Sequence, residues 1–146
     1  MLNIESIINN ELEKYKSDIE KIDDIKSIDC ITIFSSSEED YNNLNSELSN
    51  NIIIDKMSSG NLYYLKDGID TIYGKLNFIK IRKYDGNYVD YRISVDFIVG
   101  HYEQFKSNID NPVIKKYDTF ELIQFKNKNS IINVISLSAR DDYKIN

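Results

Sequence analysis

The chain has few of the residue types on which many functional sites depend. Cys30 is its single cysteine, which excludes a disulfide within the chain and any zinc site built from several thiolates. His101 is its single histidine, and the chain has one proline and no tryptophan. No apolar run approaches the roughly 20 residues of a membrane-spanning helix. We therefore expect a protein of a reducing compartment that does not associate with membranes.

The chain also contains fewer basic residues than acidic ones. The 18 Lys and Arg residues are outnumbered by 24 Asp and Glu residues, which leaves a net charge of −6. Nucleic-acid binding over a broad face depends on neutralising phosphates, so this balance argues against it. An acidic chain instead favours a small ligand or a basic protein partner. The N-terminal residues contain no basic segment followed by an apolar core, so we expect no targeting signal and a cytoplasmic location.

A chain of 146 residues is long enough for one well-packed domain and too short for two of ordinary size, so we expect a single domain over residues 1–146. Residues 1–25 are predicted to contain an amphipathic helix, because apolar side chains recur every three or four positions. These side chains are Ile4, Ile8, Leu12, Tyr15, Ile19 and Ile22. Such a stripe packs within the domain or forms the seam of a homodimer.

The rest of the chain repeats one order of elements: a strand, a helix and three strands. The first copy covers residues 28–83 and the second covers residues 92–138. The strands of the first copy are predicted at 28–34, 52–57, 62–66 and 76–83, with a loop punctuated by Gly68 and Gly74 before the last. Those of the second are predicted at 92–99, 113–117, 120–125 and 131–137. Residues 139–146 are expected to form a loose polar tail.

Two successive βαβββ modules behind a helix resemble the vicinal oxygen chelate superfamily of glyoxalases, ring-cleaving dioxygenases and bleomycin-resistance proteins. Ile-Asp-Cys-Ile-Thr-Ile at residues 28–33 is similar to the first strand of that superfamily. Ser-Val-Asp-Phe-Ile-Val at residues 94–99 resembles the corresponding strand of YecM-like proteins, and Asn-Phe-Ile-Lys-Ile-Arg-Lys at residues 77–83 resembles the fourth strand of the first module. The resemblance implies an α+β fold in which both modules form one cupped mixed sheet.

The same resemblance indicates that the superfamily's metal site is degenerate. Cys30 stands where a metal-binding histidine is usual, Ser94 replaces another histidine, Asp96 replaces a nearby glutamate, and Lys80 lies near the usual acidic ligand. Asn133 falls at a further ligand position. A lysine ammonium has no free lone pair and repels a cation. We therefore expect no metal and no cofactor.

Lys80 and Arg82 share one face of their predicted strand and lie on the polar side of the cup in the implied fold. Together they have the chemistry to hold a carboxylate or phosphate group, with Arg82 able to make a bidentate contact. The simpler reading is a solvated strand face or an ion pair with Asp96. Ser94, Asp96, Cys30 and Thr32 complete the same candidate ligand site, although side chains of their size are equally at home packed within a sheet.

No combination of acid, base and nucleophile identifies an enzyme in this sequence. Cys30 and His101 fall on different elements, so they are not expected to form a catalytic pair. The sequence leads to a hypothesis of a metal-free binding protein for a small anionic ligand. The alternative is an acidic interaction module, such as an inhibitor or immunity-type protein, that binds a basic partner and fills the cup with its own side chains.

Overall fold

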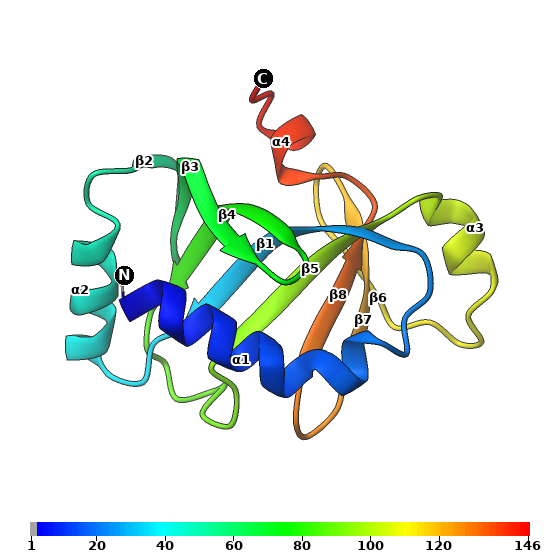
Figure 1. The fold of residues 1–146 in the computed structure, drawn as a ribbon, viewed down its shortest axis with the longest axis horizontal. Coiled ribbons are helices and arrows are strands. Elements are labelled where there is room, and N and C mark those ends of the chain that lie inside the picture. Colours follow the sequence, from blue (N-terminus) through cyan, green and yellow to red (C-terminus); the bar gives the residue numbers. More distant parts are fainter. Residues whose placement is uncertain (1–2) are drawn as a thin grey trace.

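The computed structural model describes residues 3–146, an α+β protein with an eight-stranded mixed sheet behind an N-terminal helix (Figure 1). The α+β class and the N-terminal helix are therefore confirmed. In chain order the elements are α1 (Asn3–Ile19), β1 (Ile25–Phe34), α2 (Glu38–Glu47), β2 (Ile52–Met57), β3 (Gly60–Thr71), β4 (Gly74–Arg82), β5 (Ile93–Val99), α3 (Tyr102–Ser107), β6 (Ile114–Lys116), β7 (Glu121–Lys126), β8 (Ile131–Ile135) and α4 (Ala139–Asp142).

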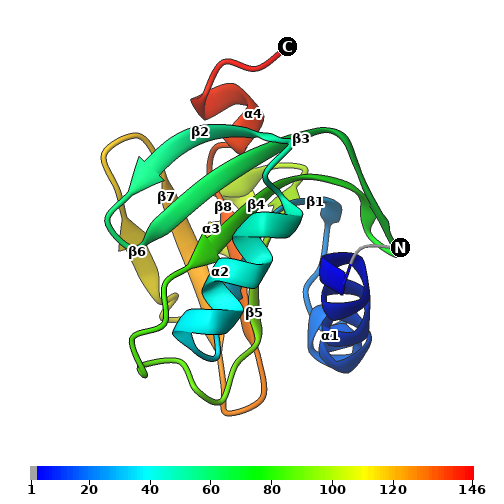
Figure 2. The same ribbon diagram turned by 90° about the vertical axis from the view of Figure 1, so that its left-hand side faces the viewer.

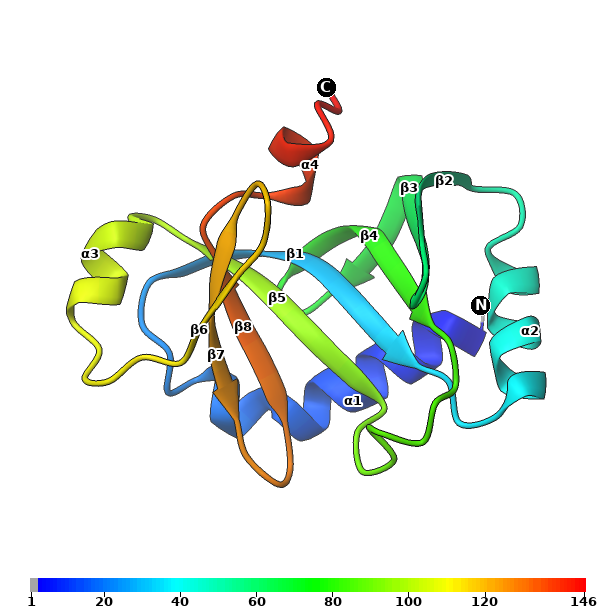
Figure 3. The same cartoon turned by 180° about the vertical axis from the view of Figure 1, so that it is seen from behind.

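The strands follow the order β2-β3-β4-β1-β5-β8-β7-β6 across the sheet, so β1 and β5 lie at its centre (Figure 3). Strand β1 runs parallel to β4 and antiparallel to β5, and β5 runs parallel to β8. The remaining neighbours are antiparallel. Side chains from β4, β1, β5 and β8 are therefore brought side by side although they are distant in the chain.

Helix α1 lies against one face of the curved sheet (Figure 2). Its buried residues are Ile4, Ile8, Leu12, Tyr15 and Ile19, which are five of the six members of the predicted stripe. The Tyr15 hydroxyl donates a hydrogen bond of 2.6 Å to the Ile93 carbonyl oxygen at the start of β5. The stripe packs within the chain and is not left free for a homodimer seam.

The helix is shorter than the predicted segment of residues 1–25, of which residues 1 and 2 lie outside the described part of the chain. It ends at Ile19, and Asp24 reverses the chain with a φ of 65° before β1 begins. Ile22 still packs against the edge of the core from this turn. No helix within residues 3–146 is long and apolar enough to cross a membrane.

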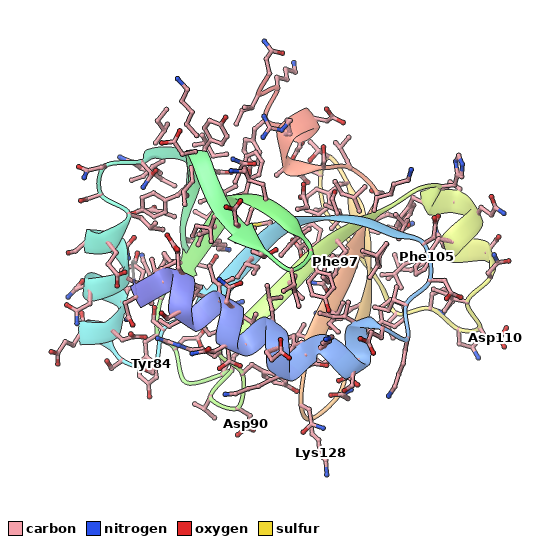
Figure 4. The ribbon with its side chains drawn as sticks, in the orientation of Figure 1. Tyr84, Asp90, Phe97, Phe105, Asp110 and Lys128 are labelled. Carbon is pink, nitrogen blue, oxygen red and sulfur yellow. The ribbon has the colours of Figure 1, made fainter. Side chains whose placement is uncertain are left out.

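The main core lies between the sheet, α1 and α2. Ile31 and Ile33 of β1 are completely buried there, as is Phe97 of β5, which Figure 4 labels over the central strands next to α1. Leu44 and Leu48 add the apolar side of α2 to the same cluster. Because successive side chains of a strand point to opposite faces, burying these residues turns their neighbours toward the other face of the sheet.

Two segments differ from their predicted structure. Residues 67–75 were expected to form a loop, but β3 continues to Thr71 and β4 begins at Gly74. The pairing of β3 with β4 is irregular between Tyr64 and Ile69, which is where the sequence departs from strand alternation. Gly68 lies within this irregularity and has a φ of +70°. Glycine reaches such a conformation without the steric penalty of a Cβ, so it bends the strand here without ending it.

Residues 139–146, expected to form a loose polar tail, fold back on the second face of the sheet. The Tyr143 hydroxyl donates a hydrogen bond of 2.6 Å to the Asp55 carboxylate of β2. Ala139, Tyr143 and Ile145 pack around a small apolar cluster that includes Phe78. These contacts join the end of the chain to β2 and β4.

The packing of α1 leads to a stability prediction. Leu12→Ala is expected to lower the free energy of unfolding by about 2–5 kcal/mol, because Leu12 is completely buried beneath the sheet and the smaller side chain leaves a cavity. Lys16→Ala, on the exposed side of the same helix, should change it by less than about 0.5 kcal/mol. Chemical denaturation measures both. Equal stability of the two variants would contradict the packing described above.

Candidate functional site

The second face of the sheet contains a hollow of about 300 Å³, which we call the cup. The six residues that the sequence proposes for ligand binding all line it: Cys30, Thr32, Lys80, Arg82, Ser94 and Asp96. Their grouping follows from the alternation along β1, β4 and β5, which places the neighbouring residues in the core. Whether these six residues bind a ligand stays a prediction.

The registers of the central strands set the arrangement within the cup. Thr32 of β1 lies opposite Lys80 on one side and opposite Ser94 on the other. Cys30, two residues earlier, lies opposite Asp96. The candidate residues therefore form three rows across the sheet. Asp96 lies in the first row with Cys30, Lys80 lies in the second with Thr32 and Ser94, and Arg82 lies in the third, opposite Phe34.

Lys80 is half-buried and belongs to no ion pair within residues 3–146. Its Nζ atom donates a hydrogen bond of 2.7 Å to the Ser59 hydroxyl in the turn between β2 and β3. Burial lowers the pKa of the Lys80 ammonium, and the charge of Arg82 lowers it further. Neither a solvated strand face nor the ion pair with Asp96 describes this lysine.

The turn that supplies Ser59 requires a glycine after it. Gly60 begins β3 with a φ of +147°, and a Cβ at this position would lie 2.0 Å from the Ile81 carbonyl oxygen. The backbone of Ser59 accepts a hydrogen bond of 2.8 Å from the Lys83 N–H. Close approach of the two strands at Gly60 therefore keeps the Ser59 hydroxyl within reach of Lys80.

Arg82 lies among aromatic rings at one end of the cup. Its Cζ atom is 4.5 Å from the centre of the Tyr88 ring, which stacks on Phe34 at 4.7 Å between ring centres. Its ion pair with Asp85 is long, at 3.5 Å, and its buried Nε–H has no acceptor within residues 3–146. Stacking holds the guanidinium in place and leaves donors for a further acceptor.

Asp96 ends a chain of side-chain hydrogen bonds across the sheet. The Gln124 amide donates to the Asn133 carbonyl oxygen at 3.2 Å, and the Asn133 amide donates to the Asp96 carboxylate at 2.9 Å. Burial raises the pKa of Asp96 to about 6, against the opposing effects of Asn133 and Lys80. Asp96 is therefore a carboxyl group that changes charge within the neutral range.

Asp29 is a second carboxyl group in the cup, and the sequence analysis did not select it. The β1–β5 register shifts between Ile28 and Cys30, so Asp29 is the extra residue of a β-bulge. Its carboxylate accepts from the Ala139 N–H at 3.0 Å. Burial raises its pKa to about 7, and the nearby charge of Asp96 contributes to the rise.

The far side of the cup is largely apolar and comes from the C-terminal half of the chain. Tyr117 and Phe120 stack at 4.9 Å between ring centres, above buried side chains of β7 and β8. The apolar residues of this wall are Tyr117, Phe120, Leu122, Ile131, Ile135 and Leu137. The sequence analysis did not assign β6 or the loop after it to the cup. These residues contain no recognisable ligand motif, and their local pattern does not predict which face of the sheet they cover.

Cys30 and His101 are not close enough in the fold to act together. Burial raises the pKa of the Cys30 thiol well above its ordinary value, with Asp96 and Asp29 adding to the rise, so the nucleophilic thiolate is disfavoured. His101 lines a separate hollow together with Asp24 and Phe105. No cluster of three or more His, Cys, Asp or Glu side chains in residues 3–146 is arranged to hold a metal ion.

The donor set in the cup also fits a divalent metal poorly. The positions implied by the family resemblance hold a protonated thiol, a hydroxyl, an amide and the Lys80 ammonium. Of these, the ammonium repels a cation and the thiol would have to lose its proton. Asp96 remains as a carboxylate donor, and metal sites in proteins need several such ligands.

Comparison with known proteins bears on the fold and not on the chemistry. No family model and no curated protein matches the chain. The chain is similar to a solved structure named "Structural Genomics, Protein EC4020", with a TM-score of 0.62 and 9% sequence identity. The similarity covers 99% of this chain and 96% of that one. At this identity the likeness shows a shared fold alone.

The carboxyl group of Asp29 leads to a prediction of pH-dependent stability. Its folded-state pKa of about 7 lies above the ordinary 3.8, so folding disfavours the ionised form. This penalty is absent below about pH 4 and complete above about pH 7. Asp29→Asn, which still accepts from Ala139, should therefore raise the free energy of unfolding by about 1–3 kcal/mol at pH 8 and by much less at pH 4.

Denaturation at both pH values measures this difference. Asp67→Asn, at an exposed position outside the cup, is the matched control and should give the same small change at pH 4 and at pH 8. A difference between Asp29→Asn and the unmodified protein that does not depend on pH would show that Asp29 is ionised in the folded chain at little cost.

Proposed function

We propose that the chain is a binding protein for a small anionic molecule, which it holds in the cup between Lys80 and Arg82. The observation that carries this proposal is a hollow of about 300 Å³ lined by both cations. Small-molecule sites begin at about this volume, and they combine apolar walls with a few placed polar groups. The wall of aromatic and aliphatic side chains opposite Lys80 and Arg82 supplies the apolar part.

Arg82 has the better geometry for the anion. Its guanidinium is about a quarter exposed and is fixed by the Tyr88 ring, while its long ion pair to Asp85 leaves donors unused. A planar guanidinium matches a carboxylate or phosphate with two parallel hydrogen bonds. Lys80 adds a second positive charge, which the Ser59 hydroxyl orients without neutralising it.

The net charge of the chain does not oppose this proposal. The charge of −6 is that of the whole chain, whereas the cup brings Lys80 and Arg82 together with Lys115 and Lys126. Exposed charges are screened beyond about 8–10 Å at physiological salt. A ligand in the cup therefore experiences mainly the nearby cations and the carboxyl groups of the cup itself.

We also propose, from the resemblance to the vicinal oxygen chelate superfamily, that the sheet consists of two βαβββ modules. On this interpretation β1, α2, β2, β3 and β4 form one βαβββ module, and β5, α3, β6, β7 and β8 form the other. The order of elements and the mirrored strand orders on either side of the β1–β5 pair support it. The poor fit of the cup to a metal ion supports binding without metal chemistry.

The alternative function is an interaction protein that recognises a basic partner through its acidic surface. That model predicts a cup filled by the protein's own side chains. The open hollow favours the small-ligand model instead.

Titration with small anions tests the proposed function. Hexanoate, benzoate and inorganic phosphate are suitable probes, measured by calorimetry and by thermal shift at low salt. We expect at least one of them to bind, with Arg82→Gln and Lys80→Met each weakening its affinity about tenfold or more through the loss of a charged hydrogen bond.

Lys83→Met is the matched control for both variants. Lys83 is exposed, directly follows Arg82, and does not line the cup. Its replacement removes the same charge from the chain and should leave binding unchanged. Equal affinities in all three variants, or the absence of binding by every probe, would reject this site.

A further inference from the structure

The charged groups that β1, β4 and β5 contribute to the cup are sorted by sign along β1. Asp29 of β1 and Asp96 of β5, which lies opposite Cys30, are the acidic members of this group. Lys80 lies opposite Thr32, and Arg82 lies opposite Phe34. On these three strands the hollow therefore has an acidic end and a basic end, and Lys115 of β6, which also lines it, lies outside this division.

The spacing of the two ends follows from strand geometry. A strand advances roughly 3.3 Å per residue, so the backbone positions of Asp96 and Lys80 differ by about 7 Å along β1, and those of Asp96 and Arg82 by about 13 Å. Lys80 increases the separation, because its Nζ atom reaches to Ser59 in the β2–β3 turn. The ends remain separate within residues 3–146, since no ion pair joins Asp96 to either cation.

Asp96 lacks the partner that a buried carboxylate normally has. Its side chain accepts one hydrogen bond, from Asn133, and no other hydrogen bond or ion pair reaches it from the described chain. Leaving an ionised group half-buried without a cation is unfavourable, which agrees with the raised pKa of Asp96. An ammonium group placed in the cup would relieve this penalty.

We propose that the ligand is an extended zwitterion, an ω-amino acid or a molecule of that shape, with its anionic group at Arg82 and Lys80 and its ammonium group at Asp96. This inference rests on the proposed function and names the ligand class for the same site. The apolar side chains that line the hollow, including Leu62 opposite Lys80, accommodate the methylene chain between the charges. An α-amino acid does not fit, because its two charges are adjacent and cannot reach both ends.

Four related compounds separate the contributions of the two ends. 6-Aminohexanoate carries its charges at opposite ends of the chain, and norleucine is its isomer with adjacent charges. Hexanoate lacks the amine, and hexylamine lacks the carboxylate. Calorimetry or amide-resonance titration at pH 7.5 is expected to show 6-aminohexanoate binding about tenfold tighter than each of the other three, because only it makes charged contacts at both ends.

The substitution Asp96→Asn then tests whether the ammonium group of the ligand lies at Asp96. Asp96→Asn should remove the preference for 6-aminohexanoate over hexanoate, because an amide cannot pair with the ammonium group. Asp67→Asn, outside the cup, should leave that preference unchanged. The ligand comparison uses the unmodified protein, so it stands even where Asp96→Asn fails to fold.

Lowering the pH to 5 provides a second test without a substitution. Protonation of Asp96 and Asp29 should then remove the preference for 6-aminohexanoate over hexanoate. The other titratable groups that face Asp96 are Cys30 of β1 and Tyr117 after β6, whose pKa values burial raises, and Lys80 of β4, whose pKa burial lowers.

The possible results distinguish this inference from the proposed function. Equal binding of hexanoate and 6-aminohexanoate would overturn the zwitterion and retain the anion site. Equal binding of hexylamine and 6-aminohexanoate, or of norleucine and 6-aminohexanoate, would overturn the two-ended arrangement. Failure of all four compounds to bind would overturn the zwitterion, and if benzoate and phosphate also failed to bind it would overturn the anion site as well.

Discussion

The burial of one face of β1 is the constraint on which the rest of the structure depends. Ile31 and Ile33 are completely buried between the sheet and α1, so Thr32 must face the opposite side. The partners of β1 on either side take up the same alternation, because β4 and β5 pair with it in register. The packing of the core thus determines which polar side chains of three strands share the cup.

Electrostatics in the cup follows from this shared burial. The site combines ammonium and guanidinium groups with two carboxyl groups, and the sheet holds them apart instead of allowing them to neutralise one another. Burial lowers the pKa of Lys80 and raises the pKa values of Asp29 and Asp96, so each of these groups is less favourably ionised than in water. Ionisable groups with pKa values perturbed in this way cluster at functional sites, which agrees with the proposal that the cup binds a ligand.

Much of the site could be recognised from alternation, and the exceptions have identifiable causes. Lys80 and Arg82 were grouped correctly on one face because nothing interrupts the pattern of their strand. Alternation along β1 predicts that Asp29 faces the core, on the same side as Ile31. A β-bulge at Asp29 turns its side chain toward the cup instead, and the sequence contains no local pattern that predicts this bulge. Gly68 lies in a segment that the sequence predicts as a loop, because glycine is depleted in strands, yet here it lies within a strand at an irregularity of the pairing. Tyr143 belongs to a short polar segment whose docking on Asp55 is a long-range contact.

The sequence by itself determined the amphipathic α1, the order of strands and helices from α1 to β8, and the two faces of β5 and of β1 beyond Asp29. These features depend on periodicities of two or 3.6 residues, which are properties of neighbouring positions. Only the tertiary structure decided that the cup stays open, that Asp29 and Asp96 approach each other, and that residues 139–146 pack over β2 and β4. These depend on strand order, on register and on the volumes of side chains distant in the chain, which no local period encodes.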